Sequence, residues 1–154
     1  MALNLPWQSV RQAMIRALRA NLVLAAALPG DWSEGAAPRE TPYPLGVIAL
    51  VPSPAVYDWS GVVWDLLVDV MIFSYDQGEA ASLDQLAFTT LQDVVLAVTG
   101  LTSLTCRRIG SLSLQDVDDK GQAVYQSGGT FRVRVAQSNP VLQTLIVTGD
   151  STIA

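Results

Sequence analysis

The longest apolar run of the chain is free of proline and extends from Gly61 to Gly78, with only two charges before its end. Alternate residues from Val62 to Ile72 are apolar, which is the pattern of a strand with one fully buried face. The stretch from Val62 to Tyr75 would reach about 45 Å as a strand, whereas a compact chain of this length has a diameter of roughly 40 Å. We therefore expect a central strand that bends or projects, and a projecting apolar strand needs a partner to cover it.

A first helix is predicted from Pro6 to Leu28, because proline suits a first helical turn and apolar residues then recur at helical spacing. Asn21 falls within its apolar side, so either that side is imperfect or Asn21 has a specific hydrogen-bond partner. The following residues, 29–44, are crowded with proline, glycine and polar residues and predict a loop, in which Trp32 docks on another part of the protein.

A second helix is predicted from Ser82, which forms a capping box with Gln85, to Gly100, which supplies the C-terminal stop. Its apolar residues line one side. Phe88 and Leu96 lie on the opposite side, and they are either a subunit contact or ordinary exposed apolar residues.

A short strand is predicted at residues 45–51, which are rich in β-branched residues and are followed by proline. We expect it to pair antiparallel with the long strand. The connection between them, residues 52–60, carries Tyr57 and Trp59, which either form a contact surface or fold back on their own domain.

A second hairpin is predicted from residues 104–117 and 123–135, around a turn that contains Gly121. In its first strand the apolar phase slips next to Gly110, as a β-bulge would cause. Its second strand is typical of one buried face, since apolar residues alternate with two arginines: Phe131, Arg132, Val133, Arg134 and Val135.

The element order α-β-β-α-β-β predicts an α+β fold, with a mainly antiparallel four-stranded sheet and two helices packed on one face. We assign residues 1–139 to this single domain. Residues 140–154 form an extended C-terminal tail that is apolar but isolated, either an extra strand laid on a neighbour or an unfolded end.

Composition narrows the functional classes. The 154 residues include no histidine and a single cysteine, Cys106, so the commonest general base and metal ligand is missing and no internal disulfide can form. Charged residues make up 15% of the chain, which leaves little charge for a monomer's surface and favours an oligomer. The net charge of −5 argues against general binding to nucleic acid or to an anionic membrane.

The sequence also predicts a soluble protein. No run reaches the roughly 20 apolar residues of a membrane span. Arginines precede the apolar stretch at residues 22–28, but they are spread along the chain rather than gathered at its start, which favours an ordinary amphipathic helix over a secretory signal.

No catalytic, cofactor or metal site is predicted. Asp65 and Asp69 would lie about 13 Å apart on one strand face, which is too far for the carboxylate pair of a glycosidase. We expect them to form a hydrated edge or an ion pair with an arginine. The segment from Asp116 to Gly121 begins like a calcium loop, but Lys120 stands at a ligand position.

Four arginines on adjacent strands could form a basic stripe: Arg107, Arg108, Arg132 and Arg134. Without interleaved aromatic residues such a stripe is a weak sign of nucleic-acid binding. We expect these side chains to pair with a neighbour's carboxylates.

Several short stretches occur in a recognisable order. An N-terminal helix rich in Leu, Ala and Arg is followed by a proline-rich loop and by residues 42–48 (PYPLGVI), and the long strand ends at Tyr75 before residues 76–80 (DQGEA) and a helix. Residues 129–135 (GTFRVRV) form the closing strand. Over residues 8–136 this layout resembles the tail terminator, or tail completion, proteins of long-tailed bacteriophages. The pair Gly128-Gly129 and the apolar tail after Pro140 depart from the pattern.

The resemblance implies a structural virion protein without catalysis or cofactor, which forms a ring, usually a hexamer, on the last ring of the tail tube. Such a ring stops tube growth and offers a surface to the head-side connector, at the head-proximal end of a tail assembled in the bacterial cytoplasm. The implied partners are further copies of the chain, the tail tube protein, the neck protein and, in a contractile tail, the sheath. DNA would pass through the lumen without specific binding.

Seven residues are candidates for subunit or tube contacts: Tyr57, Trp59, Trp64, Phe88, Leu96, Arg132 and Arg134. We expect the loop-side end of the long strand to project toward a neighbour or the tube. Two alternatives stay open. One is another neck or head-tail joining protein of a phage or phage-like contractile machine, and the other is a small-molecule binding module with a pocket near Trp59 and Trp64.

Overall fold

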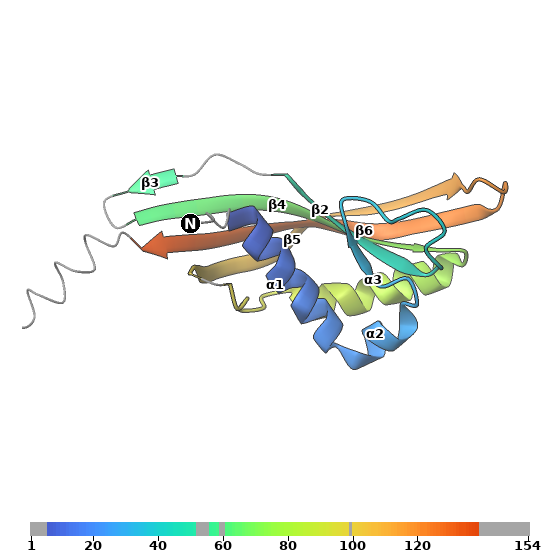
Figure 1. Ribbon diagram of the computed structural model, residues 1–154, viewed down its shortest axis with the longest axis horizontal. Helices are drawn as coiled ribbons and strands as arrows, with labels where there is room; N and C mark the ends of the chain where they lie inside the picture. Colours follow the sequence, from blue (N-terminus) through green and yellow to red (C-terminus); the bar gives the residue numbers. More distant parts are fainter. Residues whose placement is uncertain (1–5, 52–55, 59–60, 99, 139–154) are drawn as a thin grey trace, which may run out of the picture.

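The computed structural model describes residues 6–51, 56–58, 61–98 and 100–138. They form one elongated sheet with all three helices on the same side of it (Figure 1). The helices are α1 (Pro6–Ala20), α2 (Leu22–Ala27) and α3 (Gln77–Leu91). The strands are β1 (Trp32–Glu34), β2 (Leu45–Val51), β3 (Val56–Asp58), β4 (Gly61–Ser74), β5 (Thr102–Val117) and β6 (Ala123–Ser138).

The α+β class is confirmed, whereas the predicted number of strands is wrong. The sheet has six strands in the order β1-β2-β4-β6-β5, and β3 pairs with β4 beside this path. All four predicted strands are present, and β2 is antiparallel to β4 as expected. The two additional strands are short, and β1 runs parallel to β2, so the sheet is mixed.

Strand β1 lies in the stretch whose composition predicts a loop. Trp32 is buried and sits opposite Gly46 of β2, where its ring occupies the space that a side chain on residue 46 would need. The prediction that Trp32 docks elsewhere is therefore confirmed. Three residues with no apolar alternation carry no strand signal of their own, and the pairing depends on this tertiary contact.

Strand β4 has the fully buried face that its alternation predicts. Leu66, Val68, Val70 and Ile72 have no exposed surface, and Phe131, Val133 and Val135 of β6 continue this apolar face. Strand β6 pairs with β4 along its entire length, from Gly61 with Ser138 to Ser74 with Tyr125. The partner that a long apolar strand requires is therefore supplied by the same chain.

The predicted first helix is two helices. Asn21 ends α1 and caps α2, because its side chain accepts a hydrogen bond from the Leu24 N–H at 3.2 Å. Its amide nitrogen also donates to Thr90 Oγ1 of α3 at 2.9 Å. Asn21 therefore has the specific hydrogen-bond partner, Thr90, that a polar residue on this apolar side requires.

The predicted limits of the second helix are wrong at both ends. Asp76 caps α3 by accepting from the Glu79 N–H at 2.8 Å, so the helix starts before the Ser82 capping box. It ends at Leu91 rather than near Gly100, since Asp93 turns away with a φ of 58° and donates its N–H to the Cys106 carbonyl of β5. Leu96 therefore lies in an irregular segment, where it is buried.

The predicted bulge in β5 is confirmed, because the register shifts between Arg108 and Gly110.

The predicted C-terminal tail, residues 140–154, lies outside the described residues. Within the described part of the chain, no helix has the length and apolar character needed to cross a membrane.

We expect the substitution Gly46→Ala to lower the free energy of unfolding by about 1–3 kcal/mol, because the new methyl group would overlap the Trp32 ring and force it to move. Urea denaturation followed by circular dichroism measures the change. Gly110→Ala is the matched control, since nothing lies within 4 Å of a Cβ added there. Equal stability of the two variants would contradict the packing role of Trp32.

Candidate interaction surface

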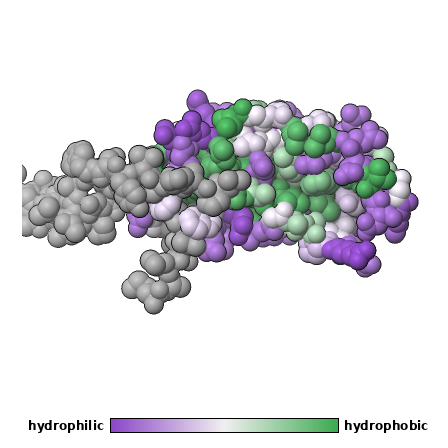
Figure 2. Space-filling view, turned by 90° about the horizontal axis from the view of Figure 1, so that it is seen from above, coloured by the Kyte–Doolittle hydropathy of each residue, from purple (hydrophilic) through white to green (hydrophobic). Residues whose placement is uncertain are grey.

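The sheet has a second face that carries no helix, which we call the open face. Residues directly opposite one another in paired strands share a face, so the residues of β4 that alternate with the buried ones lie here together with their partners on β6 and β5. Figure 2 looks onto this side of the molecule, where apolar residues gather over the middle of the sheet among hydrophilic ones. The helices leave the open face of the sheet uncovered (Figure 1).

One end of the open face carries an ionic cluster. Arg132 donates from Nε to Asp65 Oδ1 at 2.9 Å, and Arg134 Nε lies 3.8 Å from Asp65 Oδ2. The hydrogen bond from Arg132 holds the pKa of Asp65 below its usual value, against the opposing effect of burial. The alternative that Asp65 forms an ion pair with an arginine is confirmed.

The second predicted carboxylate of this face is also satisfied internally. Asp69 accepts a hydrogen bond from Thr130 Oγ1 at 2.6 Å. Asp65 and Asp69 therefore have separate partners on β6 and do not act on a shared position. In the described residues, no group of three or more carboxylate and cysteine side chains is placed to hold a metal ion.

The middle of the open face is apolar. Leu67 of β4 is 40% exposed, and Leu112 and Leu114 of β5 are 39% and 50% exposed. Met71 and Phe73 lie half-buried on the same face. Gly128 of β6 lies between Met71 and Leu112 in the register, where a Cβ would meet the Met71 side chain. This apolar centre is bordered by the ionic cluster on one side.

The other end of the open face is covered by the loop before β2. The rings of Tyr43 and Tyr75 lie 4.5 Å apart between centroids, and the Tyr75 hydroxyl donates to Asp118 at 3.0 Å. An open hollow of about 1000 Å³ lies here between the loop at residues 37–45 and the hairpin turn at residues 117–120. Trp64 does not line this hollow, so it is not the pocket expected near Trp59 and Trp64.

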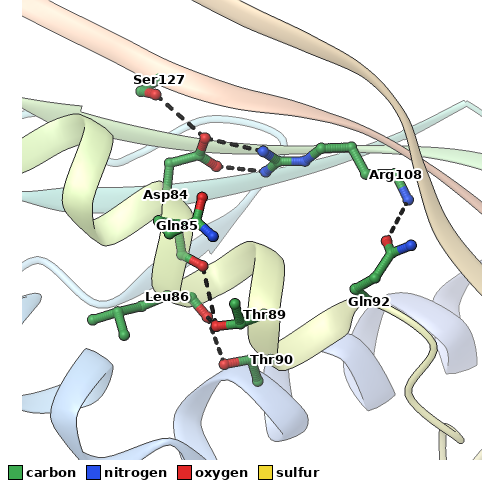
Figure 3. Close-up of polar contacts among 8 residues, drawn as sticks. All are labelled: Asp84, Gln85, Leu86, Thr89, Thr90, Gln92, Arg108 and Ser127. Carbon is green, nitrogen blue, oxygen red and sulfur yellow. Dashed lines mark hydrogen bonds and ion pairs between the residues drawn. The ribbon is translucent and has the colours of Figure 1, made fainter.

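Arg108 differs from the other three arginines because it faces the helices. Its guanidinium forms a two-pronged ion pair with Asp84 of α3, with one N–O distance of 3.0 Å, and Ser127 donates to the same carboxylate (Figure 3). The guanidinium also lies 5.1 Å from the Phe88 ring centre and 5.2 Å from that of Phe131. This buried pair fastens α3 to the β5–β6 hairpin.

The four arginines consequently do not form one basic stripe. Arg107 bonds to Asp93 at 2.8 Å, and Arg132 and Arg134 share Asp65. Each arginine has a carboxylate of the same chain within ion-pair distance, and Arg108 is on the opposite face from the rest. The arginines pair with carboxylates as expected, but these carboxylates belong to the same chain rather than to a neighbour.

The structure separates the seven predicted contact residues. Arg132 and Arg134 lie on the open face, whereas Trp64 faces the helices and meets the Trp7 ring edge-on, with centroids 6.2 Å apart. Tyr57 belongs to β3, and Trp59 lies outside the described residues. Phe88 is half-buried under Arg108 and Leu96 is buried, so their predicted position on an exposed helix side is wrong.

The exposed leucines of β5, Leu112 and Leu114, are not among the residues that the sequence predicts as contacts. Their signal is the strict alternation Ser111, Leu112, Ser113 and Leu114, which predicts one apolar face on that strand but does not reveal that helices fail to cover it. That fact depends on which sheet face the helices pack against.

No protein family model matches the chain, and no curated protein matches it. Among solved structures, a chain from the "virion of native gene transfer agent (GTA) particle" aligns with 17% sequence identity. The alignment covers 82% of this chain and 94% of that chain, with a TM-score of 0.60. The two chains share a fold. The match extends over nearly the whole of the virion chain and so includes both the helices and the sheet.

Removal of the buried carboxylate should be costly. We expect Asp84→Ala to lower the free energy of unfolding by about 3–5 kcal/mol, because it leaves the Arg108 guanidinium buried without a counter-charge. Chemical denaturation measures the loss. The double variant Asp84→Ala, Arg108→Met serves as control and should recover most of it, and a double variant as unstable as Asp84→Ala would contradict this role.

The ionic cluster should respond to acid. Since the folded-state pKa of Asp65 is lowered, its stabilising contribution is present above the unfolded value of 3.8 and is lost as the pH falls further. Asp65→Asn should therefore cost at most about 1 kcal/mol at pH 7, and its difference from wild type should shrink as the pH falls below 3.8. Urea denaturation from pH 7 into this acidic range tests the expectation, with the exposed Asp119→Asn as control. A difference that does not shrink below pH 3.8 would contradict it.

Proposed function

We propose that this chain is a structural protein of a phage-like virion, and that it forms a ring at the head-proximal end of the tail tube. The observation that carries the proposal is the shared fold with the gene transfer agent virion chain, over 94% of that chain. A fold can serve several functions, so the position within the particle is argued from the sequence resemblance and from the surfaces.

The stretches that resemble tail terminator proteins occupy structural positions that join the main elements. Residues 75–76 connect β4 to α3, where Asp76 caps the helix. Residues 129–135 lie in β6, the strand between β4 and β5. These two stretches lie at the centre of the fold, which supports a common arrangement of strand, helix and closing hairpin.

A ring requires each copy to offer one surface and to accept another. The apolar centre of the open face is suited to such a contact, since Leu67, Met71 and Phe73 present apolar surface on a rigid central strand. Arg132 and Arg134 at its border would orient the neighbour, and β3, with Tyr57 and the following Trp59, is proposed to contact the tube. The half-buried Phe88 and buried Leu96 are not proposed as contacts.

The ion pairs of the open face are also consistent with DNA passing through the ring without being bound. Every arginine on the open face is held by a carboxylate of the same chain, so these side chains attract a phosphate backbone less than free arginines would. We propose that DNA passes through the ring without specific binding. The tube protein, the head-side neck protein and, in a contractile tail, the sheath are the proposed protein partners.

Addition of the purified chain to tubes assembled from the tube protein of the same genome tests the proposal. We expect electron microscopy to show a ring on one end of each tube and the tubes to stop growing. Leu67→Asp should reduce the fraction of capped tubes about tenfold or more, because a carboxylate would be buried in the ring contact. Leu22→Asp, which changes an exposed leucine of α2 on the helix side of the sheet, is the matched control.

Two results would contradict the assignment. Sedimentation with portal-bearing heads but not with tubes would identify a head-side joining protein instead. Uncapped tubes at saturating concentration of the folded chain would exclude a role in ending tube growth.

A further inference from the structure

The edge of β5 that faces away from β6 is covered by another segment up to Arg108 and is left uncovered by the described residues after it. Before this point the segment after α3 covers it: Asp93 donates its N–H to the Cys106 carbonyl at 2.8 Å, and Gln92 accepts the Arg108 N–H at 3.0 Å. From Ile109 to Val117, no other described segment bonds to the outer backbone groups, and only the Asp116 side chain accepts from the neighbouring Val117 N–H. We call residues 109–117 the free edge.

The free edge lacks the usual protection of an exposed strand. Soluble proteins protect such edges with lysine, proline or inward-pointing charges, but the sequence IGSLSLQDV contains one charged residue, Asp116, and neither lysine nor proline. Ile109 and Val117 are 58% and 60% exposed, in addition to the two leucines between them. The combination of unpaired backbone and exposed apolar side chains calls for a partner strand.

The sequence of the free edge is complementary to itself. When two copies are aligned antiparallel about Ser113, each leucine faces the other leucine of the second copy, and Ile109 faces Val117. The polar residues Ser111 and Gln115 face each other on the opposite side of the strand. Asp116 faces Gly110, so the two carboxylates stay apart and no like-charge pair forms.

We propose that the free edge pairs antiparallel with the same edge of a second copy of this chain, joining the two sheets into one. The contact is two-fold symmetric, which is the commonest arrangement of homo-oligomers. It brings the leucine pairs together on the open face, and on the other face it pairs Ser111 with Gln115 and Ile109 with Val117, so a strand of different pattern would leave either the leucines or the serines unmatched. The proposal does not rest on the ring, whose contacts have a different symmetry.

Cross-linking at the symmetry axis tests the geometry. In the full-length chain, Ser113→Cys places two thiols on directly opposed residues, whose Cα atoms lie about 5 Å apart, within the range of a disulfide. The native Cys106 does not interfere, because it is buried and burial raises its pKa to about 12. We expect mild oxidation to give a covalent dimer whose linked peptides both contain residue 113.

Asp119→Cys, at the exposed hairpin turn and away from the axis, is the control and should give no covalent dimer under the same oxidation. Comparable cross-linking of the two variants would show random collision and overturn the proposal. A cross-link from residue 113 to any other segment, residues 139–154 included, would also overturn it, since another segment would then occupy the edge.

A charge-swap pair tests the register. Leu112→Lys, Leu114→Lys places like charges opposite each other across the axis, whereas Leu112→Lys, Leu114→Glu places opposite charges there with the same loss of apolar surface. We expect native mass measurements to show wild type at twice the monomer mass and the Lys/Lys variant to dissociate at about tenfold higher protein concentration than the Lys/Glu variant, because its dimer is weaker. Thermal unfolding verifies that both variants fold.

A monomeric wild type at all concentrations, or equal dissociation of the folded Lys/Lys and Lys/Glu variants, would overturn the proposal. These outcomes are separable from failure of the proposed function, which is measured on tube ends with Leu67→Asp, a substitution on β4 outside the free edge.

Discussion

The structure depends on the pairing of two long strands that have helices on only one side. Strands β4 and β6 are bonded along their full length, and their buried face, from Leu66 to Ile72 and from Phe131 to Val135, is the centre of the apolar core. Burial of this face supplies the main driving force for folding. Because no helix covers the opposite face of the sheet, its side chains must be stabilised by contacts with one another, with the loop before β2 or with another protein.

The open face is stabilised at its ends and left apolar in its middle. Asp65 forms ion pairs with two arginines at one end, and Tyr43 and Tyr75 cover the other. A buried ion pair on the helix side, between Asp84 and Arg108, then determines where the β5–β6 hairpin is attached to α3. Such a pair contributes more to the choice of one arrangement than to net stability, because burial of both charges costs free energy. Beyond Arg108, β5 extends past the last contact that α3 provides.

Much of this arrangement could be predicted from the sequence, since a strand buried on one face has a periodic pattern. The alternation in β4 and in β6 predicts both strands and their buried faces, and the slip of the apolar phase in β5 predicts the bulge near Gly110. Asn21 was recognised as a polar residue in need of a partner. These features are local: the residues that create the signal are the residues that form the element.

The remaining features depend on contacts between distant residues. Strand β1 exists because Trp32 fills the space above Gly46, and the end of α3 is set by a hydrogen bond from Asp93 to β5. The sequence places Phe88 and Leu96 on an exposed helix side. In the structure the helix ends five residues before Leu96, and Arg108 covers Phe88. The candidate surface was missed for the same reason, since exposure of the open face depends on where all three helices pack.

The arginines of the open face are paired within the chain, which limits how strongly this surface can bind a charged partner. Ion pairs within the chain satisfy the arginines of the open face, so a partner gains little by supplying its own carboxylates or phosphates there. The leucines of β4 and β5 have no such internal compensation, and water is their neighbour until another protein surface replaces it. Affinity at these surfaces therefore comes from apolar burial and backbone pairing, while the bordering charges select orientation. This combination supports the proposal that the chain assembles with other protein subunits rather than holding a charged ligand.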